Sequence, residues 1–170
     1  MLFAVLATLA LAGWIFYCLV RRYFDNVQKE RLLQMKIDER RETLKVVTPI
    51  RLQAYERMAL FLERISPNSL VLRCWQPGMD LHLLQGVMTK NIRDEWEHNL
   101  SQQVYLSPAV WAHIREAKDE MVNLVNSAAV SLAESTDPTQ LAASVFASAA
   151  QHSPTDTALE LLHKEINELF

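Results

Sequence analysis

Apolar residues are distributed along this chain in two different ways. The first twenty residues, MLFAVLATLALAGWIFYCLV, contain no charged side chain, and the other 150 carry every Lys, Arg, Asp and Glu. A helix of twenty residues spans roughly 30 Å, which matches the hydrocarbon core of a bilayer. This pattern predicts a transmembrane anchor over residues 1–20.

The C-terminal end of this apolar run predicts how the anchor is oriented. Trp14 and Tyr17 favour the interface between membrane and water, and Arg21 and Arg22 follow directly. Because positively charged flanks stay in the cytoplasm, we expect a single pass with the N-terminus outside and the bulk of the chain inside. A cleaved signal peptide and a buried core helix are the alternatives. The small residues ALA at 10–12 could precede cleavage, but no basic region comes before the run, and the run continues well past them.

The next segment predicts a charged helix that continues out of the membrane. Residues 21–45 carry eight basic and five acidic side chains, and no Gly or Pro interrupts residues 22–48. Opposite charges on neighbouring helical turns stabilise such a helix. Its apolar stripe is broken, so three roles remain open: a spacer, a parallel coiled coil with a second copy, or a lipid contact through Arg21 and Arg22.

Five of the six prolines directly follow a residue that commonly caps a helix. Ser, Thr and Asp side chains accept a hydrogen bond from a free N–H at a helix start, and proline suits the first helical position because that N–H is unpaired anyway. The sixth proline, in the sequence QPG at residues 76–78, predicts a turn before a cap at Asp80. The five predicted helix starts are Thr48-Pro49, Ser66-Pro67, Ser107-Pro108, Asp137-Pro138 and Ser153-Pro154.

Apolar residues between these starts recur at intervals of three and four, as on one face of a helix. The longest regular stripe, in residues 108–134, has the narrow spacing of a bundle seam. Arg51 is an exception, because it lies on the apolar side of its segment. Residues 70–75 could form a short helix or an extended segment, since a lone strand would have no sheet to join. The predicted core residues are Ile50, Ala54, Met58, Phe61, Leu62, Ile65, Leu81, Leu84, Met88, Ile92, Trp96, Val110, Ile114, Ala117, Met121, Leu124, Ala128, Leu141, Val145, Ala149, Leu159, Leu162, Ile166 and Leu169.

These patterns together predict an all-α protein with three parts. Residues 1–20 are the transmembrane anchor, residues 21–47 the charged juxtamembrane helix, and residues 48–170 a compact cytoplasmic bundle of four or five helices. The polar run at residues 98–103 is interpreted as a fraying helix end whose carbonyls accept from amide side chains, with a polar recognition surface as the alternative.

Three stretches of the chain resemble one known group of proteins. They are RLQAYERMALFLERI at residues 51–65, QPGM at 76–79 and EHNLSQQVY at 97–105. Together they resemble an uncharacterised family of small, single-anchor, helical inner-membrane proteins from Bacteroidota, over most of the chain. The resemblance implies a bacterial inner-membrane setting. It brings no activity and no catalytic residues.

Two Glu-x-x-His spacings are the strongest candidates for chemistry. Glu95 precedes His98 by three residues, and Glu160 precedes His163 in the same way. Two such pairs on different helices, with two further carboxylates, build the di-iron site of ferritin-like bundles. However, His98 and Glu160 fall off the apolar stripes, so we expect structural or solvent-facing roles, no metal and no cofactor. The further carboxylates could come from Glu56, Glu63, Glu116, Asp119 or Glu120.

The remaining sequence features argue against several functional classes. Residues 46–170 carry nine basic and fifteen acidic side chains, which disfavours nucleic acid as a partner. No common catalytic or phosphate-binding motif is present, so no small-molecule substrate is evident. Cys74 has no nearby His or second Cys and is expected to be a packing residue. We also expect Trp75, Trp96 and Trp111 to pack in the core, with an exposed aromatic patch for a partner as the alternative.

The sequence therefore favours a non-enzymatic function. We expect a membrane-anchored helical scaffold or accessory subunit that presents a cytoplasmic surface to a protein partner or to its own copies. The alternative is a metal-dependent, di-iron-like helical enzyme that uses the Glu/His pairs. A third possibility is a structural protein near the lipid surface without a fixed partner.

Overall fold

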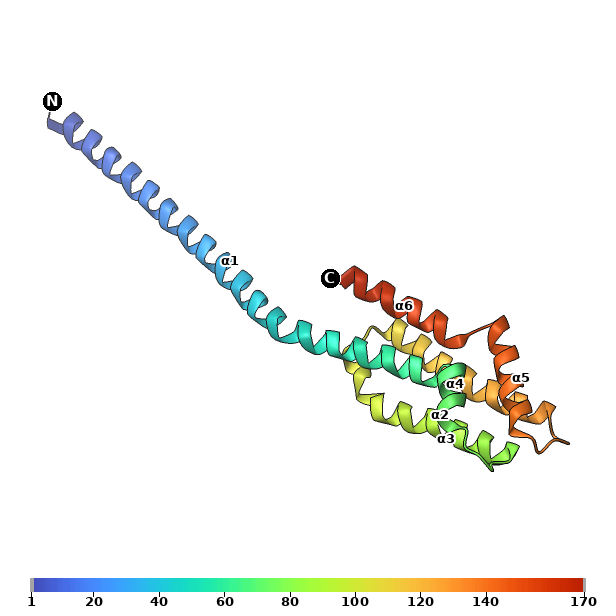
Figure 1. The fold of residues 1–170 in the computed structure, drawn as a ribbon. Coiled ribbons are helices and arrows are strands. Elements are labelled where there is room, and N and C mark those ends of the chain that lie inside the picture. Colours follow the sequence, from blue (N-terminus) through green and yellow to red (C-terminus); the bar gives the residue numbers. More distant parts are fainter. Residues whose placement is uncertain (1, 170) are drawn as a thin grey trace. The chain divides into compact units, whose positions relative to one another are not determined.

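The computed structural model describes the backbone of residues 2–169 and the side chains of residues 11, 13–17 and 19–168. Helix makes up 88% of the structure, and no strand occurs in the part described, which confirms the all-α prediction. Seven helical elements follow one another along the chain (Figure 1). They are α1 Leu2–Ile65, α2 Pro67–Cys74, α3 Leu81–Asn99, the short 3-10 helix η1 Leu100–Val104, α4 Pro108–Ser131, α5 Pro138–Gln151 and α6 Pro154–Leu169.

The chain divides into two compact units, Met1–Thr48 and Pro49–Phe170. The first unit consists of the N-terminal part of α1. Twelve of its residues, namely 1–10, 12 and 18, lie outside the described side chains, and most of the predicted anchor is among them. Among the described residues, no helix combines the length and apolar content needed to cross a bilayer.

The predicted membrane flanks can be described as part of α1. Trp14 and Tyr17 are 68% and 59% exposed, and Arg21 and Arg22 are exposed as well. Nothing in the described part of the first unit covers these side chains.

The prediction that Thr48-Pro49 starts a helix is wrong. α1 continues through both residues, and Pro49 lies inside it. An interior proline removes one helical hydrogen bond, but the helix can continue where the segments on both sides are strongly helical. Residues 22–48 contain no Gly or Pro and residues 50–65 form a packed amphipathic face, so both flanks favour helix. The same dipeptide can therefore stand at a helix start or inside a helix.

The other start signals are confirmed, since α2, α4, α5 and α6 all begin at the predicted proline. Ser66 differs from the other caps because its hydroxyl donates to the carbonyl of Glu63 at 2.8 Å and makes no cap bond. Three predicted caps accept a backbone N–H: Asp80 from Leu83 at 2.7 Å, Ser107 from Val110 at 3.2 Å and Asp137 from Thr139 at 2.8 Å.

The second unit has a single hydrophobic core formed by the end of α1 and all the later α-helices (Figure 1). α4 is the central element and packs against α3, α5 and α6, while α2 and α5 both pack on α3 and on each other. The largest fully buried side chains are Tyr55, Phe61, Met58, Leu62, Ile65, Leu70, Leu81, Leu84, Met88, Ile92, Ile114 and Met121.

The predicted stripes match this core with few exceptions. Ile50 is 41% exposed, which contradicts its prediction, because it lies at the very start of the second unit. In α4, Val125 is fully buried while Leu124 only packs against the core from its edge. A seam of alternating three and four residues drifts around a straight helix, which explains the shift by one position. Leu169 has no described side chain.

Residues 70–75 were predicted to form a short helix or an extended segment, and the structure contains both. Residues 70–74 belong to α2, and Trp75 then adopts an extended backbone with φ −70° and ψ 131°. The predicted turn follows, with Gly78 at φ 87°, a conformation that favours glycine because it has no Cβ. The chain thus leaves the helical conformation at Trp75.

The polar end of α3 is tighter than predicted. α3 ends at Asn99, and the chain continues as the 3-10 helix η1 to Val104. The Asn99 side-chain amide donates to the carbonyl of Glu95 at 2.8 Å. This agrees with the prediction that amide side chains pair with the carbonyls at this helix end. Such 3-10 turns are frequent at helix ends because they satisfy carbonyls that lack a partner.

Candidate functional site

An apolar groove lies between α2 and α5. It has a volume of about 360 Å³ and is lined by Val71, Leu72, Trp75, Thr139, Ala142, Ala143 and Phe146. Leu72 is 79% exposed, and Trp75 and Phe146 are 42% and 37% exposed. Nearly all the groove surface is therefore carbon from large or small apolar side chains. Contiguous exposed apolar surface rimmed by polar residues is typical of interaction sites.

The position of Trp75 corrects the expectation that all three tryptophans pack in the core. Trp96 and Trp111 stack on each other with ring centroids 4.6 Å apart, and both pack against the core. Trp75 instead follows the last residue of α2 in extended backbone and lies over the groove. The alternative of an exposed aromatic surface thus holds for Trp75.

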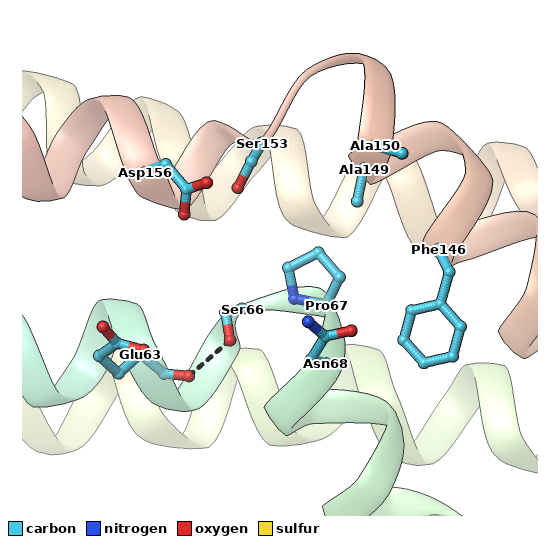
Figure 2. A pocket seen from close by; sticks show the side chains of 9 residues that line it. All are labelled: Glu63, Ser66, Pro67, Asn68, Phe146, Ala149, Ala150, Ser153 and Asp156. Carbon is cyan, nitrogen blue, oxygen red and sulfur yellow. Dashed lines mark hydrogen bonds between the residues drawn. The ribbon is translucent and has the colours of Figure 1, made fainter.

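A second cavity continues from the same region toward the end of α1 and the start of α6. It has a volume of about 400 Å³, and Figure 2 shows its lining residues. Glu63 and Asp156 lie toward one end of it and Phe146 toward the other. Phe146 lines both the groove and this cavity, which also contains Glu63 and Asp156, so the two hollows are neighbours on either side of one side chain.

A polar network ties three helices together on another part of the bundle. Glu165 of α6 accepts hydrogen bonds from the hydroxyls of Tyr55 and Ser107, and from the Ser107 N–H at 3.1 Å. Arg51 donates to the Tyr55 hydroxyl at 3.2 Å and to the carbonyl of Tyr105 at 3.2 Å. The sequence signal for this network was Arg51 itself, a charged residue on an apolar face. Its partners are 54 or more positions away, apart from Tyr55, so spacing could not identify them.

This network shifts the pKa values of two of its members in opposite directions. Burial raises the pKa of Tyr55 to about 12, and the hydrogen bond to Glu165 adds to the increase. For Glu165, burial is the largest single influence and acts to raise the pKa, but the hydrogen bonds from Ser107 and Tyr55 and the charge of Arg51 outweigh it. The net pKa of Glu165 lies below its ordinary value. The network therefore favours a neutral tyrosine beside an ionised carboxylate.

We expect these shifts to make the stability of the bundle depend on pH at both extremes. Tyr55 has a higher pKa folded than unfolded, so its contribution is present below pH 10 and is lost as pH rises toward about 12. Glu165 has a lower pKa folded, so its contribution is present at neutral pH and is lost as pH falls through that lowered value. Denaturant titrations across pH would measure both. Tyr55→Phe should flatten the alkaline limb, and an unchanged alkaline limb in that variant would contradict the assignment.

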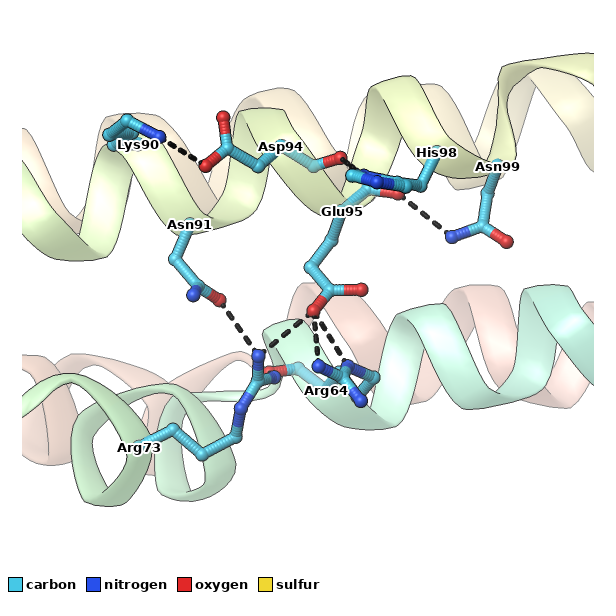
Figure 3. Close-up of polar contacts among 8 residues, drawn as sticks. All are labelled: Arg64, Arg73, Lys90, Asn91, Asp94, Glu95, His98 and Asn99. Carbon is cyan, nitrogen blue, oxygen red and sulfur yellow. Dashed lines mark hydrogen bonds and ion pairs between the residues drawn. The ribbon is translucent and has the colours of Figure 1, made fainter.

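The predicted metal candidates are held in other interactions. Glu95 accepts from Nη2 of Arg64 at 2.5 Å and from Nη2 of Arg73 at 2.9 Å, and Figure 3 shows both guanidinium groups converging on its carboxylate. Arg73 also donates to the side chain of Asn91 at 3.2 Å. Glu95 therefore links α3 to the ends of α1 and α2.

The two Glu/His pairs are not brought together. His98 is exposed, with its Nδ1 at 2.7 Å from the carbonyl of Asp94, and Glu160 and His163 are exposed on α6. In the part of the chain that the structure describes, no three His, Cys, Asp or Glu side chains are grouped closely enough to hold a metal ion. Cys74 is buried, and this burial raises its pKa, in keeping with a packing role.

Two of the further carboxylates considered as ligands lie in a smaller cavity between α4 and the start of α6. Glu116 is 3.5 Å from His113, and Glu120 is 3.4 Å from His152. The cavity has a volume of about 240 Å³, and these side chains are all largely exposed at its rim. They form two separate surface pairs.

We expect purified protein to carry no stoichiometric transition metal, because Glu95 is already paired with two arginines and its predicted partners His98, Glu160 and His163 are exposed. Elemental analysis of the full chain tests this directly. About two metal ions per chain, lost in a Glu95→Ala, Glu160→Ala variant, would instead support a di-iron site.

The chain belongs to the family of unknown function DUF7935, whose profile matches residues 1–169. This confirms the resemblance to an uncharacterised family over most of the chain. Neither the curated proteins nor the solved structures gave a match.

Proposed function

We propose that this protein is a scaffold or accessory subunit, held at a bacterial inner membrane by residues 1–20, whose cytoplasmic bundle docks a protein partner. The observation that carries the proposal is the apolar groove between α2 and α5. The resemblance to single-anchor proteins from Bacteroidota supports the membrane setting. The N-terminus would lie outside the membrane and residues 21–170 inside the cell.

Support for the anchor comes from composition and charge. Residues 1–20 carry no charged side chain, and Arg21 and Arg22 follow them directly. α1 runs from Leu2 through the rest of this segment without a break, so the backbone groups beyond its first turn can be satisfied within one helix. That condition must be met by any segment in a hydrocarbon environment. Trp14 and Tyr17 would lie near the cytoplasmic interface.

Support for docking comes from where apolar surface remains on a bundle that already has a core. The second unit buries residues from six α-helical segments in one cluster, so Leu72 and Trp75 are not needed to complete it. An exposed leucine alone is unremarkable on a protein surface. Here it lies beside an exposed tryptophan and phenylalanine over a formed hollow, and aromatic residues in such positions commonly dominate binding energy.

Site-specific photo-crosslinking in living cells tests the docking role. A photoreactive residue at position 72 or 143, both at the groove, should give a discrete crosslinked band. The same residue at position 104 or 130 is the control, because Val104 and Val130 are 77% and 75% exposed but lie outside the groove. Crosslinks of equal yield at all four positions, or none at the groove, would contradict a docking platform.

A further inference from the structure

We propose that the groove and the acidic cavity together bind one amphipathic helix of a partner protein, with its apolar side chains in the groove and basic side chains at one end. This inference rests on the proposed docking function and specifies the chemistry of the partner. An amphipathic helix inserts apolar residues at intervals of three and four into such a groove.

The apolar half has the shape and lining that a helix face requires. Its lining includes buried Val71 and the small residues Ala142 and Ala143, and small side chains on α5 allow a helix backbone to approach it closely. Its walls are Leu72 and Trp75 on one side and Phe146 on the other. A volume of about 360 Å³ is enough for apolar side chains of a partner to enter the groove.

The acidic half supplies the direction and the charge preference. Glu63 and Asp156 line it, and no Lys or Arg is among its lining residues. Figure 2 shows Glu63 and Asp156 at the end of the cavity away from Phe146, the residue that this cavity shares with the groove. Among the described residues, neither carboxylate takes part in an ion pair. Both remain available for cationic side chains of a partner.

The overall charge of the bundle agrees with this choice. Residues 46–170 carry nine basic and fifteen acidic side chains, so an acidic helix would be repelled on approach and a basic one attracted. The two halves meet at Phe146, so one helix can reach both. The apolar side chains of the partner helix would then supply most of the affinity. Glu63 and Asp156 would determine which end of that helix lies toward α6.

Two matched probe peptides test the inference. Each is a helix of about four turns with leucines at intervals of three and four; one carries two lysines at its end and the other two glutamates there. The full chain is placed in phosphatidylcholine nanodiscs, and binding is followed by fluorescence anisotropy with empty nanodiscs as the blank. A chain that fails to enter nanodiscs would count against the anchor alone, and the same titration would then be run on the free chain.

The lysine peptide should bind more tightly than the glutamate peptide, by about tenfold, which corresponds to roughly 1.4 kcal/mol. Leu72→Glu should weaken the lysine peptide by about tenfold or more, since it places a charge in the apolar half. Val130→Glu, the matched control at an exposed valine outside the groove, should leave binding unchanged. Exchange of both carboxylates, Glu63→Lys with Asp156→Lys, should reverse the preference between the two peptides.

Four outcomes would overturn the inference. Equal binding of both peptides would show that Glu63 and Asp156 do not select the charge of the helix. Equal effects of Leu72→Glu and Val130→Glu would show that the helix does not bind in the groove. Tighter binding of a peptide of residues 21–45, the basic segment of this chain, with the same dependence on Leu72, would make a second copy the occupant in place of a partner. Groove crosslinks in cells without peptide binding would leave docking intact and exclude this partner chemistry.

Discussion

Met121→Pro should unfold the bundle, whereas Ser107→Ala should leave it folded with a lower melting temperature. Met121 lies in the middle of α4, the helix that packs against α3, α5 and α6, and its side chain is fully buried. Proline there removes a helical hydrogen bond and clashes with the preceding turn, at a cost of about 3 kcal/mol or more. Loss of the buried side chain adds about 2 kcal/mol or more. The sum approaches the whole stability of a typical small domain.

Ser107→Ala acts at the end of the same helix and should be much milder. Loss of a cap costs about 1 kcal/mol. The Ser107 hydroxyl also donates to Glu165, so we expect about 2 kcal/mol in all. Circular dichroism melts of residues 48–170 would measure both variants, with Met121→Ala as the control that changes packing but keeps the backbone. If Met121→Pro melts as high as Ser107→Ala, α4 is not a continuous packed helix.

Glu165→Ala should lower the free energy of unfolding by about 3 kcal/mol. The substitution leaves three donors without their acceptor, two on Ser107 and one on Tyr55. Tyr55 is fully buried, so its hydroxyl cannot turn to bulk water instead. Arg51 also loses the opposite charge of Glu165, with which it interacts. A buried donor without an acceptor lowers the free energy of unfolding by more than the intact hydrogen bond contributes to it.

Urea titrations can separate this network effect from a general loss of surface charge. Glu168→Ala is the matched control, because Glu168 is an exposed acid on the same helix. It should change stability by less than about 0.5 kcal/mol. Glu165→Gln should fall between the two, since the amide keeps the shape but offers a weaker acceptor. Equal effects of Glu165→Ala and Glu168→Ala would show that the network contributes nothing beyond a surface acid.

The sequence predicted the parts of this fold that depend on local rules. Caps at Asp80, Ser107 and Asp137 and the core stripes of α3 and α4 follow from short-range chemistry and helical period, so they could be read from spacing. Thr48-Pro49 was misread because the same dipeptide is compatible with a start and with an interior position. Only the surrounding helical preference decides between them, and here it favours continuation.

The candidate site could not be predicted from residue spacing in the same way. Leu72 on α2 and Trp75 just after it are more than sixty positions from Phe146 on α5. They line one groove only because α2 and α5 both pack on α3. Glu95 was a weak candidate for a metal ligand because Glu-x-x-His spacing places both residues on one face of a helix. The residues opposite that face come from α1 and α2, which supply Arg64 and Arg73. The spacing within α3 carries no information about them.

In the function we propose, residues 1–20 hold the bundle at the cytoplasmic face of a membrane. C-terminal fusions of the full chain to alkaline phosphatase and to a fluorescent protein test it most directly, combined with carbonate extraction of membranes. We expect an inactive phosphatase, a bright fluorescent protein and a chain that stays in the carbonate pellet. Leu11→Arg with Ile15→Arg, which breaks the apolar run far from the bundle, should release the chain into the soluble fraction. An active phosphatase with a dark fluorescent fusion, or an unaltered chain that is soluble in carbonate, would contradict the claim.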